Sequence, residues 1–83
     1  DQSAAVARAF VMALRESQRA IATIEKWLFT AAKHPSAAVR SAAQDVAAAR
    51  GGSVAERMGR LGAGDADPAV RLAAIGTFDR NRR

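Results

Sequence analysis

The sequence contains no cysteine and no tyrosine, and it has only one tryptophan, one histidine and two prolines. Without cysteine there is neither a disulfide framework nor a thiolate metal ligand, so the chain is not a stapled secreted mini-domain. A single histidine, His34, cannot form the usual zinc-binding sets and leaves few general-base schemes. We therefore expect no metal site and no cofactor.

Long apolar runs and an excess of acidic residues are also absent. No run approaches the roughly 20 apolar residues that are needed to span a bilayer. Thirteen basic residues stand against eight acidic ones, and the net charge of +5 favours acidic partners. The chain begins at Asp1 rather than Met, which indicates processing or a longer parent chain, and no signal peptide is visible. The lack of cysteine and of a visible leader favours the cytoplasm.

Alanine is abundant, at about a quarter of the chain, and it is the best helix former. The length of 83 residues allows one small domain, and the hydrophobic content of 49% is too high for disorder. Small side chains let helices approach closely, but each buries little apolar area. We expect modest stability, completed by a partner or by further repeats.

A long segment without glycine, proline or asparagine predicts an amphipathic helix over residues 3–33. Ser17 lacks a Glu or Gln three residues later, so no capping box supports a break. One continuous helix is therefore favoured over a pair of helices that meet around residues 15–17. The expected apolar stripe, at steps of 3 and 4, consists of Val6, Phe10, Ala13, Ser17, Ile21, Ile24, Leu28 and Ala31.

Three shorter helices are predicted over residues 36–50, 53–62 and 67–79, followed by a basic tail over residues 80–83. Ser36 is the expected N-cap of the first, and the pair Gly51-Gly52 ends it. A capping box, Ser53 to Glu56, opens the second, and Asp67-Pro68 opens the third. No alternating strand pattern occurs, so the predicted fold is all-α. The expected buried stripes are Val39, Ala42, Ala43, Val46 and Ala47; Val54, Met58 and Leu61; and Val70, Ala73, Ala74, Thr77 and Phe78.

Two stretches of the sequence are alike. The segment 36–43 (SAAVRSAA) and the segment 67–74 (DPAVRLAA) both read cap, two residues, Val-Arg, any residue, Ala-Ala. They lie 31 positions apart, and each follows a helical stripe, which is the pattern of a helix–turn–helix repeat. Over residues 19–79 the chain resembles the HEAT-like repeat family, whose second helix opens with Asp-Pro, Val-Arg and paired alanines. The first copy lacks the Asp and the Pro. The resemblance implies an α-solenoid scaffold that binds a protein or a nucleic acid. The predicted fold is a short HEAT-like solenoid or bundle of four to five helices, led by the long N-terminal helix.

Arg40 and Arg71 occupy equivalent positions of the two copies. The resemblance implies a structural role for this arginine, in which it bonds to carboxylates or to turn carbonyls, and ligand contact is the alternative. Asp45 and Asp67 are the candidate partners.

Basic side chains recur at spacings of 7, 4, 7 and 7 along residues 3–33. On one continuous helix they would form a row about 37 Å long, almost opposite the apolar stripe. Such a row suits a phosphate backbone or an acidic protein surface, and the alternative is an ordinary solvated helix face. The residues of this predicted basic row are Arg8, Arg15, Arg19, Lys26 and Lys33.

Some apolar residues lie off the stripes of their helices. Isolated exposed apolar residues are common, but those at the end of a solenoid would cover the next repeat or a partner. The predicted docking surface consists of Leu72, Ile75, Val11, Met12 and Phe29.

The sequence offers no nucleophile–base pair and no phosphate-binding loop, so catalysis is not expected. The predicted function is protein–protein interaction by a non-catalytic helical-repeat module within a larger assembly or a longer chain. The alternative is binding of a nucleic-acid backbone through the basic row.

Overall fold

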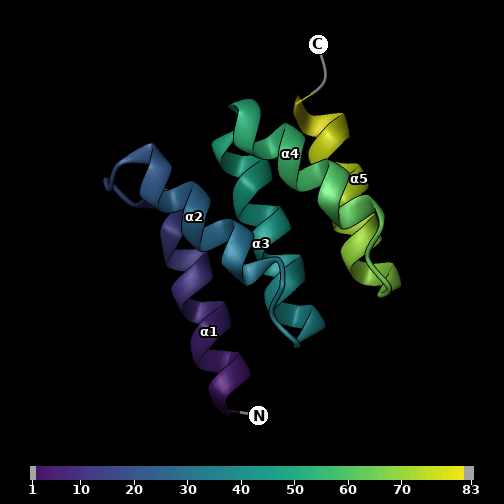
Figure 1. The fold of residues 1–83 in the computed structure, drawn as a ribbon, viewed down its shortest axis with the longest axis horizontal. Helices are drawn as coiled ribbons and strands as arrows, with labels where there is room; N and C mark the ends of the chain where they lie inside the picture. Colours follow the sequence, from purple (N-terminus) through teal and green to yellow (C-terminus); the bar gives the residue numbers. More distant parts are fainter. Residues whose placement is uncertain (1, 82–83) are drawn as a thin grey trace.

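The all-α prediction is confirmed. The computed structural model describes the backbone of residues 2–81 and the side chains of residues 3–77, and this part of the chain contains no strand. Figure 1 shows how the helices of this part follow one another along the chain. They are α1 (Gln2–Ala13), α2 (Ile21–Ala31), α3 (Ala37–Arg50), α4 (Gly52–Ala63) and α5 (Pro68–Asn81), with a 3-10 turn η1 (Leu14–Glu16) after α1.

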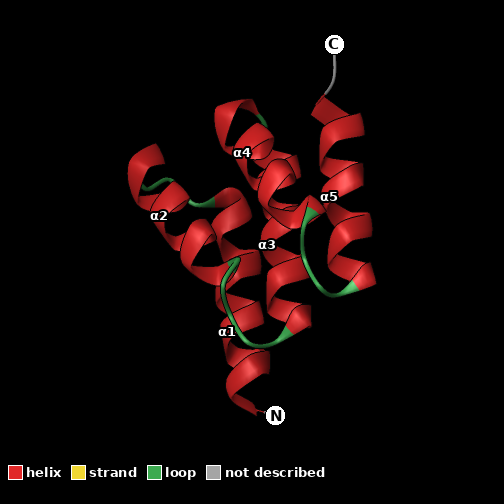
Figure 2. Ribbon diagram, turned by 45° about the vertical axis from the view of Figure 1, so that its right-hand side comes forward, coloured by secondary structure: helices red, strands yellow, loops and turns green. Residues whose placement is uncertain are grey.

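The helices form two layers. Figures 1 and 2 together place α1, α3 and α5 side by side in one layer, with α2 and α4 in front of them. Helices of one layer run in the same direction, opposite to those of the other layer (Figure 1). The α2–α3 and α4–α5 turns consequently lie at the same end of the molecule (Figure 2).

The long helix expected over residues 3–33 is wrong, because the structure has the alternative pair of helices. The helical path ends at η1, and Ser17 turns to extended backbone with a ψ of 141°. No glycine or proline causes this break. Instead, Nη1 of Arg50 reaches the carbonyl oxygens of Leu14 (2.9 Å), Arg15 (3.2 Å) and Ser17 (3.4 Å). A side chain from the end of α3 thus bonds the carbonyls that a continuous helix would use internally.

The break changes which face of α1 is buried. Val6 and Phe10, expected in the core, are exposed, whereas Val11 and Leu14 are each only 3% exposed. Ile21 is exposed as well, because it opens α2 immediately after the break. The second half of the predicted stripe, Ile24, Leu28 and Ala31, is buried as expected.

Helix α3 forms the centre of the core. All five residues of its predicted stripe are buried, and their small side chains let α1 and α5 pack closely on either side. In α4 the residues Val54 and Met58 are buried, but Leu61 is not. In α5 the structure buries Val70, Ala74 and Thr77. The predicted stripe residue Phe78 lies outside the described side chains.

The bounds of α3, α4 and α5 differ from the expected ranges by at most two residues, but some caps differ in kind. Gly51 and Gly52 have φ values of 72° and 70°, the left-handed conformation expected of them. Ser36 stands at an N-cap without a side-chain cap bond. Ser53 lies inside α4, so the predicted capping box is wrong. The predicted tail begins within α5, and its side chains lie outside the described residues.

Candidate functional site

Arg40 braces the turn between α2 and α3. Its Nη1 donates to the carbonyl oxygens of His34 (2.8 Å) and Pro35 (2.9 Å). The backbone N–H of Ser36 donates to Nδ1 of His34 at 3.0 Å. His34 therefore accepts twice in this turn, through its imidazole Nδ1 from Ser36 and through its own backbone carbonyl from Arg40.

Arg71 braces the turn between α4 and α5 in the same way. Its Nη1 donates to the carbonyl oxygens of Asp65 (2.8 Å) and Ala66 (3.0 Å), and the N–H of Asp67 donates to Oδ1 of Asp65 at 2.8 Å. Each donor and acceptor lies 31 positions after its counterpart in the first turn. Both turns are thus held by the same set of hydrogen bonds, with Asp65 at the place of His34.

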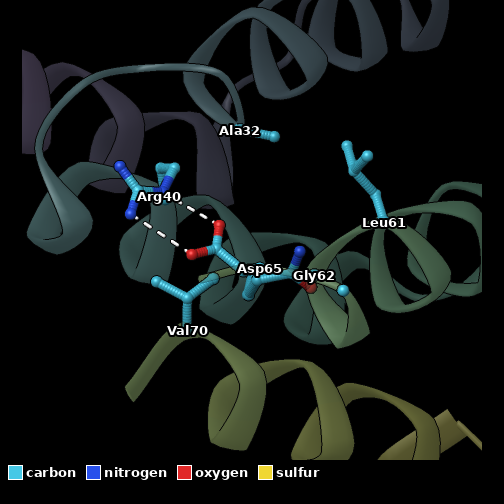
Figure 3. Close-up of a pocket in the computed structure, with 8 residues that line it drawn as sticks. Ala32, Arg40, Leu61, Gly62, Asp65 and Val70 are labelled. Carbon is cyan, nitrogen blue, oxygen red and sulfur yellow. Dashed lines mark hydrogen bonds and ion pairs between the residues drawn. The ribbon is translucent and has the colours of Figure 1, made fainter. Parts of the chain in front are cut away.

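An ion pair joins the first hairpin, formed by α2 and α3, to the second hairpin, formed by α4 and α5. Arg40 donates from Nε to Oδ2 of Asp65 (2.9 Å) and from Nη2 to Oδ1 (3.2 Å), so that its planar guanidinium holds the carboxylate with two bonds (Figure 3). The two side chains are 18% and 13% exposed. The expectation that Asp45 or Asp67 pairs with these arginines is wrong. Asp67 instead caps α5, where its Oδ1 accepts from the N–H of Ala69 at 2.8 Å.

The pKa of Asp65 lies below its ordinary value. The main cause is the hydrogen bond from Arg40, followed by the bond from the N–H of Asp67, and these outweigh the opposing effect of burial. Because Asp65 also accepts bonds through its backbone carbonyl, the residue ties together α3, its own turn and α5.

The lowered pKa predicts an acid-sensitive contribution to stability. A carboxyl whose pKa is lower in the folded chain stabilises the fold fully above its unfolded pKa, and this contribution is lost as the pH falls through the folded value. We expect the free energy of unfolding to fall between about pH 5 and about pH 2 less steeply in Asp65→Asn than in the wild type. Denaturant titrations across that range measure the two slopes, and equal slopes would contradict the assignment.

Gln44 and Gly62 bring α3 and α4 into close contact beside this ion pair. Gln44 is 1% exposed, and its Nε2 donates to the carbonyl oxygen of Met58 at 2.7 Å. A Cβ at Gly62 would lie 2.8 Å from both Gln44 Cδ and Ala74 Cβ. A cavity of about 220 Å³ remains between these helices, lined in part by Arg40, Asp65 and Val70 (Figure 3).

The prediction that five basic residues form one row along a helix is wrong, because these residues lie on separate elements. Arg8 is on α1, Arg15 is in η1, Arg19 is in the connecting loop, Lys26 is on α2 and Lys33 follows α2. Arg19 stacks over Trp27 at 5.3 Å from the ring centroid, and Arg8 lines a cavity together with Asp45 and Asp67. No single helix face therefore presents the five cations together.

The predicted docking residues divide into two groups. Val11 is buried and therefore cannot dock a partner, and Met12 and Phe29 are half-buried against the core. By contrast, Leu72 and Ile75 on α5 are 70% and 51% exposed. Their docking role remains a prediction.

A second apolar surface was not predicted from the sequence. Val6 and Phe10 on α1 border a cavity of about 340 Å³, and Phe10 meets Trp27 of α2 edge to face at 5.3 Å. The sequence carried no signal for this surface, because on one continuous helix these residues fall on the core stripe.

The described part of the chain has neither a metal-binding cluster nor a membrane-spanning helix. The described residues bring no three His, Asp or Glu side chains together where they could hold a metal ion. None of the helices in this part of the chain is both long and apolar enough to cross a membrane. Comparisons of the chain with models of protein families, with curated proteins and with solved structures found no match.

Proposed function

We propose that this chain is a non-catalytic helical-repeat module of the HEAT-like, α-solenoid kind, which binds a protein partner or further repeats through its C-terminal edge. This C-terminal edge is the exposed face of α5 around Leu72 and Ile75. The two turns with the same hydrogen bonds, 31 positions apart, support the repeat. Two layers of helices, each running in a single direction, support side-by-side stacking.

A comparison of two equivalent positions carries the proposal. Gln44 on α3 is 1% exposed, because α4 covers it. Its counterpart 31 positions later is Ile75, an apolar residue that is 51% exposed on α5. The position that is covered in the first hairpin, Gln44, is thus exposed in the second hairpin, where it is the more apolar Ile75. The neighbouring Leu72 is exposed as well. Exposed apolar surface of this kind marks interaction sites.

Introducing negative charge on the C-terminal edge tests whether this surface binds a partner. We expect the double variant Leu72→Asp, Ile75→Asp to keep the helicity and the free energy of unfolding of the wild type within about 0.5 kcal/mol, because both side chains are exposed. It should fail to retain the proteins that co-purify with the immobilised wild-type chain and are identified by mass spectrometry.

A matched control lies on the opposite edge of the molecule. Val6 is 69% exposed on α1 and Leu72 is 70% exposed on α5, so Val6→Asp introduces the same single charge as Leu72→Asp alone, at an equally exposed apolar residue. This variant should retain the partner. If the double variant binds the partner as tightly as the wild type does, the proposed function is wrong.

A further inference from the structure

Within the part of the chain whose side chains are described, only Nη1 of the Arg71 guanidinium is held by hydrogen bonds. Its Nη1 is fixed by the carbonyl oxygens of Asp65 and Ala66, as Nη1 of Arg40 is fixed by the first turn. In Arg40, the remaining Nε and Nη2 hold the Asp65 carboxylate. Among the residues whose side chains the structure describes, no hydrogen-bond partner takes Nε and Nη2 of Arg71.

The two arginines make the same bonds to the carbonyls of their own turns, but they differ in what lies beyond them. Beyond Arg40 stands the α4–α5 hairpin, which supplies the carboxylate of its turn and covers Gln44. Beyond Arg71 the described residues place no hairpin, and Ile75 is left exposed. The donor pair and the apolar residue belong to one edge, because their counterparts are covered by one hairpin.

We infer that Arg71 and Ile75 form a receptor for a helical hairpin whose interhelical turn carries a carboxylate. Nε and Nη2 of Arg71 would receive the two carboxylate oxygens, and one helix of the hairpin would cover Ile75. A planar guanidinium already fixed at Nη1 loses little further freedom on binding. Its positive charge and its two remaining donor nitrogens favour a carboxylate over a neutral acceptor. This inference rests on the proposed function and adds the chemistry of the partner.

A second copy of this chain does not fit the receptor. Of its two interhelical turns, the first has His34 at the required position, and an imidazole in that place offers no carboxylate. The second turn has Asp65, but this carboxylate is already held by Arg40 of its own chain. The hairpin must therefore have a different sequence, with a turn carboxylate that no arginine of its own chain holds.

An extended chain tests the receptor directly. In this designed variant, residues 1–81 would be followed directly by a second copy of residues 51–83. The spacing of 31 positions between repeats is kept, because Arg50 and Asn81 are equivalent positions. The added copy thereby places its own Asp65 next to Arg71. We expect the added hairpin to dock, with amide hydrogen exchange protected along both of its helices.

The carboxylate is tested by a double-mutant cycle on this extended chain. Arg71→Gln, or Asp65→Asn in the added copy alone, should each accelerate exchange in the added hairpin about tenfold, and the double variant should be no faster than either single variant. Arg71→Gln in the original chain is the matched control, since it measures the loss of the bonds to its own turn.

Two results would overturn the inference. If the added hairpin docks but Arg71 and the added Asp65 act independently, the carboxylate assignment is wrong, while the proposed docking through the C-terminal edge stands. If the added hairpin stays unprotected, α5 does not receive a hairpin in this register. The proposed function is then decided separately by the Leu72 and Ile75 variants.

Discussion

Replacement of Arg40 by alanine is expected to lower the free energy of unfolding by about 2–4 kcal/mol. The substitution leaves the Asp65 carboxylate without its two-bonded partner, although that side chain is only 13% exposed. It also removes the donor that serves the carbonyl oxygens of His34 and Pro35. A loss of this size is a large part of the stability of a small domain. Urea denaturation followed by circular dichroism measures it.

Arg60 provides the matched control, because it makes an ion pair on the surface. Its Nη2 donates to Glu56 one helical turn earlier, with both side chains more than half exposed. Arg60→Ala should therefore cost no more than about 0.5 kcal/mol. A second variant, Arg40→Lys, keeps the charge but loses the planar fork, and it should recover only part of the stability. Similar small losses for Arg40→Ala and Arg60→Ala would show that Arg40 does not join the hairpins energetically.

Replacement of Gly62 by alanine is expected to destabilise the fold by about 1–3 kcal/mol, although alanine is the better helix former. The added methyl group would meet Gln44 and Ala74, and it would lie only 2.8 Å from Ala74 Cβ. Gln44 cannot retreat without losing its bond to Met58, and Ala74 has no rotamer to change. The helices α4 and α5 would have to separate, which thermal unfolding should record as a lower midpoint.

Gly76 gives the opposite expectation for the same chemical change. A Cβ at this position of α5 meets nothing within 4 Å. Gly76→Ala should therefore stabilise the fold by up to about 1 kcal/mol through helix propensity and reduced freedom of the unfolded chain. If Gly62→Ala stabilises the protein as Gly76→Ala does, the close approach of α3 and α4 described above is wrong.

The sequence predicts well where local signals and burial agree. Asp67 and Pro68 mark the start of α5, because one caps the helix and the other supplies its first residue. Gly51 ends α3 and Gly52 opens α4, both with a positive φ that only glycine adopts readily. The stripe of α3 was predicted in full, since this helix lies between neighbours and one face of it is entirely buried.

The fold of residues 3–33 could not be predicted in this way. Local propensity favours one helix there, and the hydrogen bonds to the carbonyls at the break come from Arg50, which is far away in the sequence. Once the helix is broken, the phase of the apolar pattern before Ser17 carries no information about the phase after it. This is why Val6 and Phe10 were assigned to the core and Val11 to the surface.

The candidate site was predicted in part. The equivalence of Arg40 and Arg71 follows from the repeated Val-Arg pattern. Their bonds to turn carbonyls agree with the structural role that the resemblance to HEAT-like repeats implies. The partner Asp65 was missed, because the sequence cannot show which carboxylate of a turn faces the preceding hairpin. Gln44 was also missed as a contact, since a single polar residue beside an alanine stripe gives no sign that it is covered.

The bond from Arg50 has a consequence for the order of events during synthesis. Because Arg50 follows α1 and α2 in the chain, the ribosome adds it only after the residues of both helices have been synthesised. Until then the nascent segment has only its local preference, which favours an uninterrupted helix. The bonds from Arg50 to the carbonyl groups at the bend between α1 and α2 can therefore form only after the end of α3 has been made.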